Sequence, residues 1–454
     1  MLGLVGAPEP SAPRPFTPPR ATERRLSNGL RVIVASRHEV PLVNAQLVFP
    51  LGAAHDPLAL LGQSYLAMAL LNYGPLGRSS DQFAADLDDL AGRFSGGATY
   101  DALSAGLSSL SELFPQVLAL CNQAVRQPGL AQEDLDRVRA RTISELRVAY
   151  GSANSLARIV MARVLYGAHP YGQPIAGVPR TLENLTRADV QRLASIRLLP
   201  DGATMVLTGD VNAEAGFALA ESAYGDWRGS GCREKSALVP VSLPSSRVVV
   251  VDLPDSGRSA VWLGRVTIER RHPRYFEGLV AMALLSGYSG RLNVAVRVKR
   301  GLSYGASAQL QARREPGPFS ATTLVDHRKV GETVEVMREV IASLVTQPPT
   351  EAELVPRKAM LRGSFGRSLD SVAGLGSSFA ELALNDLPLS EYDEYLARID
   401  AVTPRAVADF ARDFLIEGLS VVVVGDAQAI VPSLRGAFAG VEEYRAADID
   451  VLTI

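Results

Sequence analysis

The sequence predicts an α+β protein made of two homologous domains, each an antiparallel sheet covered by helices. A helix start, an apolar strand and a Gly-Asp pair occur once in each half of the chain. Thr403 follows Thr186 by 217 residues, and Gly425 follows Gly209 by 216. A matched unit at nearly constant offset indicates an internal duplication. The 454 residues are also too many for one ordinary hydrophobic core.

The composition excludes several classes of protein. Hydrophobic residues make up 47% of the chain and charged residues 21%, which is typical of a soluble globular protein. The net charge of −2 argues against a nucleic-acid-binding role. Two cysteines, Cys121 and Cys232, supply neither a disulfide framework nor a metal cluster. No apolar run reaches the roughly 18 residues that a membrane span needs.

Composition also places the domain boundaries. Residues 1–24 are rich in Pro and Ala and predict a disordered leader. The first domain is expected over 25–228 and the second over 247–454. Between them, 229–246 holds Gly, Ser, Pro and charge, as a linker does. If an export signal has been removed, the compartment is expected to be the periplasm, and otherwise the cytoplasm.

The elements of the first domain follow from turn signals and hydrophobic periodicity. Arg25–Phe49 predicts a hairpin, with a turn signal at Asn28-Gly29 and strands over Leu30–Ala35 and Val43–Phe49. Phe94–Ser109 alternates around Gly96-Gly97 and predicts further strands. Thr186 begins a helix with Asp189 as its capping acid. Four helical patterns precede it, at Leu58–Asn72, Ser79–Arg93, Glu112–Gln127 and Gln132–Tyr150.

A corner in the second domain carries the first candidate functional residues. Ser289–Arg300 predicts a short amphipathic helix, Gly301 suits the position after a helix end, and Leu302–Arg313 alternates like a strand. Arg297 and Tyr304 are therefore expected to meet across a helix-to-strand corner. A guanidinium and a phenol hydroxyl can both stabilise a developing oxyanion. Taken alone, this stretch also fits a surface arginine and a core tyrosine, because function has to be argued from a whole site.

Several motifs occur in the order found in one known family. In the first half these are Asn28–Val32, His169-Pro170-Tyr171-Gly172, Gly177, the helix start at Thr186 and Gly209-Asp210. In the second half they are Ser289–Leu292, Arg297–Tyr304, Val402-Thr403 and Gly425-Asp426. In this ordered combination the chain resembles the pitrilysin and mitochondrial-processing-peptidase family of zinc peptidases, the inverzincins. The resemblance runs from about Arg25 to Asp426.

The zinc motif of this family is degenerate in the chain. The family binds zinc with a His-x-x-Glu-His helix and a distant Glu, and the Glu between the histidines is the base for the attacking water. Tyr65 and Ala69 stand at the two His positions and Met68 at the Glu position. Glu145 falls where the distant Glu belongs, 76 residues after Ala69. A thioether and a methyl group cannot replace a carboxylate and an imidazole, so we expect no catalytic zinc and no other cofactor in this chain.

The resemblance assigns a role to the corner in the second domain. In the family, the residues that match Arg297 and Tyr304 reach an active site formed by the other half-molecule, bind the substrate carbonyl oxygen and stabilise the tetrahedral intermediate. The two domains are then expected to face each other as a partial clamshell. A homologous partner bearing His-x-x-Glu-His would hold the zinc, and the substrate would be a peptide or unfolded polypeptide.

The sequence therefore predicts a non-zinc subunit of a heterodimeric zinc endopeptidase, inactive by itself, with Arg297 and Tyr304 acting in trans. The alternative is an inert pseudopeptidase that serves as a scaffold or peptide-binding protein. A third possibility, an independent hydrolase, lacks support because the sequence shows neither a Gly-x-Ser-x-Gly elbow nor a Cys/His nucleophile set.

Overall fold

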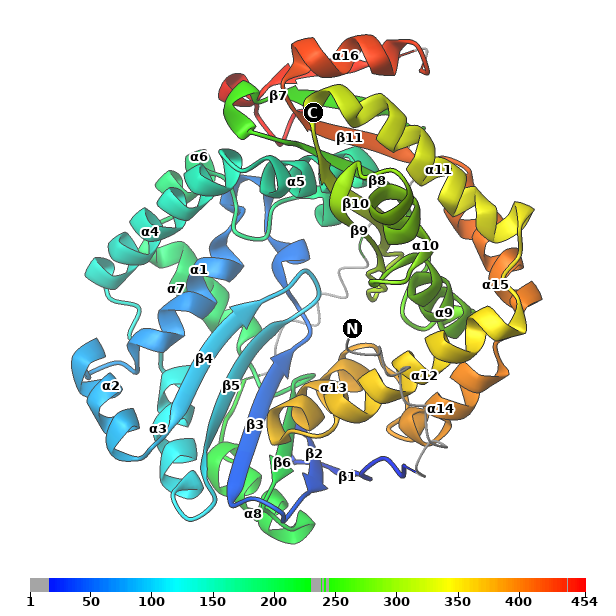
Figure 1. Ribbon diagram of the computed structural model, residues 1–454. Helices are drawn as coiled ribbons and strands as arrows, with labels where there is room; N and C mark the ends of the chain where they lie inside the picture. The colour runs from blue at the N-terminus through cyan, green and yellow to red at the C-terminus, as the bar shows by residue number, and fades with distance from the viewer. Residues whose placement is uncertain (1–15, 230–237, 239–240, 242–244, 439) are drawn as a thin grey trace, which may run out of the picture.

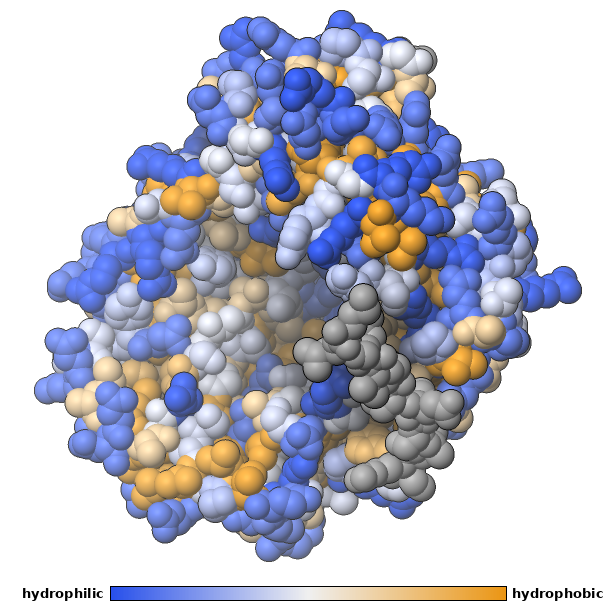
Figure 2. All heavy atoms as spheres, in the orientation of Figure 1, coloured by the Kyte–Doolittle hydropathy of each residue, from blue (hydrophilic) through white to orange (hydrophobic). Residues whose placement is uncertain are grey.

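The computed structural model describes residues 16–229, 238, 241, 245–438 and 440–454, and these form two six-stranded sheets flanked by helices (Figure 1). The first sheet has the order β1-β2-β6-β3-β5-β4. Its strands are β1 (Thr22–Arg25), β2 (Arg31–Ser36), β3 (Leu42–Phe49), β4 (Arg93–Ala98), β5 (Leu103–Leu110) and β6 (Thr204–Gly209). The two halves surround a hollow that is open on the face shown in Figure 2.

The second sheet repeats the topology of the first. Its order is β12-β7-β11-β8-β10-β9, with β7 (Val248–Asp252), β8 (Ser259–Val266), β9 (Ser303–Leu310), β10 (Pro318–Val325), β11 (Ser420–Gly425) and β12 (Glu442–Arg445). In each half, the strand that ends in Gly-Asp lies parallel to the first long strand and antiparallel to the next one. This shared topology confirms the α+β fold of two homologous domains.

The predicted hairpin was wrong in its strand pairing. Asn28-Gly29 does form a turn, but it joins β1 to β2, and β2 and β3, the two strands expected to pair, do not pair with each other. β6 comes late in the sequence of the first half, yet it lies between β2 and β3. In this central position the three strands bury faces that a two-stranded hairpin would leave exposed. The sheets are consequently mixed rather than purely antiparallel. Residues 22–24, assigned to the leader, belong to β1; the rest of the leader up to residue 15, and most of the linker, lie outside the described residues.

The helices agree closely with the sequence patterns. Ser79 caps its helix with a complete capping box, and Thr186 and Thr403 cap theirs through their side chains. The helices of the first half are α1 (Gln63–Leu70), α2 (Ser80–Asp89), α3 (Phe114–Arg126), α4 (Gln132–Tyr150), α5 (Ala153–Tyr166), α6 (Pro179–Asn184), α7 (Arg187–Arg197) and α8 (Ala213–Tyr224). Those of the second half are α9 (Tyr275–Leu285), α10 (Arg291–Asn293), α11 (Val330–Thr346), α12 (Glu351–Ser368), α13 (Val372–Leu384), α14 (Glu391–Ala401), α15 (Pro404–Ala411) and α16 (Ala427–Arg435).

Helix α1 is shorter than the pattern over Leu58–Asn72 predicts, because Gly62 interrupts that stretch with φ of +96°. A Cβ at Gly62 would lie 2.8 Å from the Ala176 carbonyl oxygen, so the close approach requires glycine. The first turn of α1 is then anchored by Asp56, which accepts hydrogen bonds from the Ser64 amide and hydroxyl and pairs with Arg197 at 2.9 Å. Burial of this network fixes α1 against α7.

In each half, one helix packs against the sheet of the other half. The inner face of the second sheet packs against α5, and the inner face of the first sheet packs against α13 (Figure 1). The Trp262 indole of β8 donates to the Asn154 side chain of α5 at 3.0 Å, and the Thr208 hydroxyl of β6 donates to the Val372 carbonyl of α13 at 2.8 Å. The clamshell is therefore held by two reciprocal apolar contacts, not by the linker alone.

Candidate functional site

The corner that carries Arg297 and Tyr304 has the geometry expected from the sequence. The helical stretch starts as α10 and continues as a π-helical segment, η6 (Val294–Lys299), from which Arg297 projects. Gly301 then reverses the chain with φ of +59°, and Tyr304 follows on β9. A π-helical insertion is often found at functional sites, because it re-aims one side chain within a helix.

Arg297 and Tyr304 are in direct contact. The guanidinium carbon of Arg297 lies 4.6 Å from the Tyr304 ring centroid and 5.2 Å from that of Tyr288, a residue that the sequence analysis did not single out. Tyr304 is 79% exposed and Tyr288 77%. Among the described residues, no hydrogen-bond or ion-pair partner engages the Tyr304 hydroxyl or the Arg297 guanidinium. Both donors are thus presented to an incoming group.

The pair borders a shallow pocket of about 530 Å³. Its walls come from η6, β9 and β10, with Asn154 of the first half at one side. Two hydrogen bonds support the corner. The Asn293 side-chain amide donates to the Tyr288 carbonyl at 2.6 Å, and the Thr323 hydroxyl donates to the Gly305 carbonyl at 2.8 Å. Fixed supports of this kind preorganise donors for a developing negative charge.

Arg291, which belongs to the same motif, has a structural task. Its guanidinium forms a forked ion pair with Glu353 at 2.8 and 2.7 Å and also donates to the Ser343 and Gln347 carbonyls. Arg291 holds the pKa of Glu353 below its usual value through these hydrogen bonds. The motif therefore contains one arginine that anchors the helix and one, Arg297, that stays free.

The degenerate zinc positions carry side chains of a kind that does not suit zinc. Met68 is fully buried in the core of the first domain, and Tyr65 and Ala69 pack against the same core. Glu145 is largely exposed on α4 and lies 3.7 Å from Arg141. Within the described residues, no three His, Cys, Asp or Glu side chains gather as metal ligands would. These residues do not fit zinc, because they offer at most one carboxylate and one phenol.

Arg297 and Tyr304 line a pocket that none of the four degenerate positions lines. Tyr65 borders a different cavity, where Leu146 rather than Glu145 stands beside it, and the two cavities share no lining residue. The action of the pair on another chain stays a prediction from the sequence.

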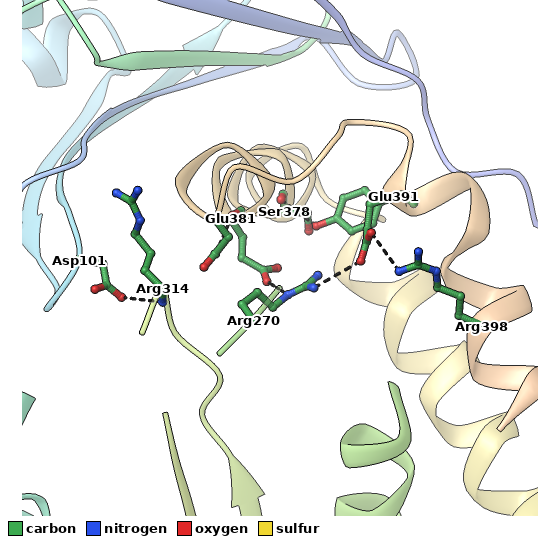
Figure 3. A network of polar contacts seen from close by, with 9 residues as sticks. Asp101, Arg270, Arg314, Ser378, Glu381, Glu391 and Arg398 are labelled. Atoms are coloured by element: carbon green, nitrogen blue, oxygen red, sulfur yellow. Dashed lines mark hydrogen bonds and ion pairs between the residues drawn. The ribbon is translucent and has the colours of Figure 1, made fainter. Parts of the chain in front are cut away.

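The His169–Gly172 motif ties the two halves together. The buried Tyr171 hydroxyl donates to Asp101 and accepts from the Glu315 amide at 3.3 Å. Asp101 also accepts from the Arg314 amide at 3.4 Å, as Figure 3 shows. Burial, reinforced by the Asp101 carboxylate, raises the pKa of Tyr171. The motif thus has a structural role in this chain.

A second network, which the sequence analysis missed, anchors α13 and α14. The almost fully buried Arg270 donates to Glu381 at 2.6 Å and to Glu391 at 3.4 Å. Glu391 also forms an ion pair with Arg398 (Figure 3). The Arg270 guanidinium lies 4.0 Å from the Tyr275 ring centroid. Arg270 and Glu391 are 121 residues apart, so no local pattern could have linked them.

One contact resembles a nucleophile pair. The Ser259 hydroxyl lies 2.8 Å from Nδ1 of His327. Ser259 is fully buried on β8, which keeps its hydroxyl away from any substrate. The contact closes the end of the second sheet beside Gly425 and gives no support to an independent serine hydrolase.

Comparisons with known proteins find relatives along most of the chain. Residues 31–177 match the family model "Insulinase (Peptidase family M16)", and residues 184–361 match "Peptidase M16 inactive domain". An uncharacterized zinc protease of Mycobacterium tuberculosis is 23% identical over 419 residues, covering 92% of this chain and 95% of that protein. One of Streptomyces coelicolor is 22% identical over 408 residues, covering 88% of each.

Solved structures show the same fold. A peptidase M16 inactive domain from Pseudomonas fluorescens has a TM-score of 0.85 at 23% identity and covers 89% of this chain and 98% of its own. A protease from Helicobacter pylori has a TM-score of 0.80 at 17% identity, covering 89% and 99%. With both family models matched in order along one chain, the protein belongs to the M16 peptidase family.

Proposed function

We propose that this chain is the non-zinc subunit of a heterodimeric zinc endopeptidase. Its partner would be a homologous chain that carries His-x-x-Glu-His and holds the zinc. The substrate would be a peptide or unfolded polypeptide. Membership of the M16 family and the degenerate motif at Tyr65, Met68 and Ala69 are consistent with a member that is not catalytic by itself.

One observation carries the proposal: Arg297 and Tyr304 are in direct contact at a corner fixed by hydrogen bonds. Neither has another polar partner among the described residues. Holding these two side chains in place costs conformational entropy, and neither forms an ion pair or hydrogen bond within the fold in return. A purely architectural role therefore does not require them. Aimed at a carbonyl oxygen that gains negative charge, a guanidinium fork and a hydroxyl bind the transition state more tightly than the ground state.

In this proposal the partner's His-x-x-Glu-His helix would hold a zinc able to activate the attacking water, and this chain would contribute binding and charge stabilisation. Arg297 donates through its fork, and its contact with the Tyr304 ring keeps that fork in place. Tyr304 donates its hydroxyl. The hollow between the two halves would leave room for an extended polypeptide (Figure 2).

A scaffold or peptide-binding pseudopeptidase is the second candidate. It is favoured by the reciprocal packing of α5 and α13, which gives the chain a self-supporting architecture without any partner. In that case the fold would be kept for its shape alone, and Arg297 and Tyr304 would have no effect on catalysis.

The experiment that separates the two candidates uses a purified complex of this chain with a His-x-x-Glu-His-bearing homologue from the same source. Three preparations are compared on one peptide: the homologue alone, the wild-type complex, and a complex with Arg297→Lys and Tyr304→Phe combined. Assembly and zinc content are equalised first. Activity that needs this chain and falls in the double variant supports the proposal. Full activity in the double variant leaves only the scaffold.

A further inference from the structure

Tyr288 is the second aromatic residue in contact with Arg297. The Arg297 guanidinium carbon lies 5.2 Å from the Tyr288 ring centroid, in addition to its contact with Tyr304 at 4.6 Å. Both distances fall within the roughly 6 Å over which a cation is attracted to an aromatic face. Tyr288 lies in the connection between α9 and α10, and Tyr304 lies on β9. One guanidinium is therefore held by two rings that come from separate segments.

These two rings are what restrains the end of the Arg297 side chain. Among the described residues, its guanidinium forms no hydrogen bond and no ion pair. An arginine side chain has many rotamers, and fixing it in one of them costs conformational entropy. A single exposed cation–π contact is weak, so one ring leaves a large share of the other rotamers populated. The second ring lowers that share, which gives Tyr288 a direct effect on where the Arg297 fork lies.

The backbone that carries Tyr288 is anchored on both sides. The Ser286 hydroxyl is hydrogen bonded to the backbone of β9. The Asn293 side-chain amide donates to the Tyr288 carbonyl itself. Arg357 of α12 donates to the Ser289 carbonyl at 2.5 Å and to the Ser289 hydroxyl at 3.0 Å. The position of the Tyr288 Cα relative to β9 is therefore fixed by three neighbouring elements.

The anchored residue contributes little to the core. Tyr288 is 77% exposed and lines the same pocket as Arg297 and Tyr304. Within the described residues, its hydroxyl has no hydrogen-bond partner, and its ring contacts no aromatic or cationic group other than Arg297. An exposed ring on a fixed loop is not explained by burial of apolar surface. Its contact with Arg297 is the interaction that this placement serves.

We propose that Tyr288 is a positioning residue, which holds the Arg297 fork in place through its ring and not through its hydroxyl. The catalytic consequence of this inference rests on the proposed function. If Arg297 stabilises the transition state, a fork that leaves its place lowers turnover more than it weakens substrate binding. Tyr288 would then act on the reaction only through Arg297.

The first test uses the isolated full chain and needs no partner. In NMR spectra of the chain with labelled arginine, ring currents should shift the Cδ protons of Arg297, and the signal is identified by its loss in Arg297→Lys. Tyr288→Leu should move this signal toward the value of a free arginine, whereas Tyr288→Phe should leave it close to its wild-type position. A signal that does not move in Tyr288→Leu would overturn the proposal.

The second test measures kcat and KM in the complex with the zinc-bearing homologue. Tyr288→Leu should lower kcat by about two- to fivefold, the factor that one exposed cation–π contact corresponds to, with KM nearly unchanged. Tyr288→Phe keeps the ring and should regain most of the lost kcat. Val298→Ala is the matched control, because Val298 is exposed on the same π-helical segment but does not line the pocket. An unchanged kcat in Tyr288→Leu, an equal loss in Tyr288→Phe, or a raised KM alone would overturn the proposal.

A double-mutant comparison shows whether Tyr288 acts through the arginine. In an Arg297→Gln background, Tyr288→Leu should lower kcat no further, because its effect passes through a side chain that is already absent. Losses that add would mean that Tyr288 contacts the substrate itself and would overturn the proposal. A wild-type complex without peptidase activity would overturn the proposed function instead, and the NMR comparison would still decide whether Tyr288 holds Arg297.

Discussion

Arg297 lies over the ring of Tyr304, with its guanidinium carbon 4.6 Å from the ring centroid. The contact joins a π-helical turn to the first residues of an edge strand, with Tyr304 79% exposed and Arg297 half-buried. A cation held over an aromatic ring is restrained without losing its hydrogen-bond donors. The pair is thus fixed in position yet unoccupied, as a transition-state contact should be before substrate arrives.

Tyr304→Phe keeps the ring under Arg297 and removes only the hydroxyl. In a complex with the zinc-bearing homologue, we expect turnover to fall by about 10²–10³-fold with assembly unchanged. Arg297→Lys keeps the charge and loses the fork, so it should also lower turnover. Arg300→Lys is the control, since Arg300 is exposed on the same turn but does not line the pocket. A control as impaired as the two variants would point to a general disturbance of the turn.

The isolated chain should carry much less than one zinc per molecule after gel filtration in zinc-containing buffer. The reason is that Met68 and Ala69 stand at positions that need a carboxylate and an imidazole. Metal analysis by mass spectrometry and a peptidase assay with and without chelator check this. One tightly bound zinc per chain, lost together with activity on chelation, would contradict it.

Gly96 on β4 lies against α1. A Cβ at this position would stand 2.0 Å from the Met68 carbonyl oxygen. Gly96→Ala should therefore lower the free energy of unfolding by about 1–3 kcal/mol, the usual cost of overpacking. Gly97→Ala is the matched control, because its Cβ would meet nothing nearer than the Ser104 hydroxyl at 3.5 Å. Denaturant unfolding of both variants measures the difference, and equal stabilities would argue against the tight α1–β4 contact.

Phe379 belongs to the second half but is buried against the sheet of the first. Phe379→Ala should cost about 3–5 kcal/mol and reduce hydrogen-exchange protection in β3 and β6. Phe410→Ala removes an equal ring from the second half's own core, so it should loosen the second sheet instead. If Phe379→Ala left β3 and β6 as protected as in the wild type, the reciprocal packing would not contribute to stability.

The Arg291–Glu353 pair predicts a dependence of stability on pH. Arg291 holds the pKa of Glu353 below its usual 4.5, so the carboxylate stabilises the fold above about that pH. This contribution is lost as the pH falls through the lowered pKa. Glu353→Gln should flatten the fall of unfolding free energy between about pH 5 and pH 3. Denaturant titrations at several pH values test this, and an unchanged slope would contradict it.

Local signals in the sequence determined much of the fold. The capping residues Ser79, Thr186 and Thr403 begin their helices as expected, because the hydrogen bonds of a cap lie within four residues. The repeated Gly-Asp unit revealed the duplication, since both copies end equivalent strands. Strand pairing was harder: β6 inserts between β2 and β3, and the sequence separation hides that partner.

The candidate site divides in the same way. The sequence determined that the metal ligands are replaced and that Arg297 and Tyr304 meet at a corner, because residue identity and a short helix–turn–strand spacing suffice for both. Only the tertiary structure placed Tyr288 beside Arg297, buried Met68 in the core and brought Arg313 and Gln173 to one cavity. Arg313 and Gln173 come from different halves of the chain. Packing between such elements depends on the whole fold, which no local pattern of residues encodes.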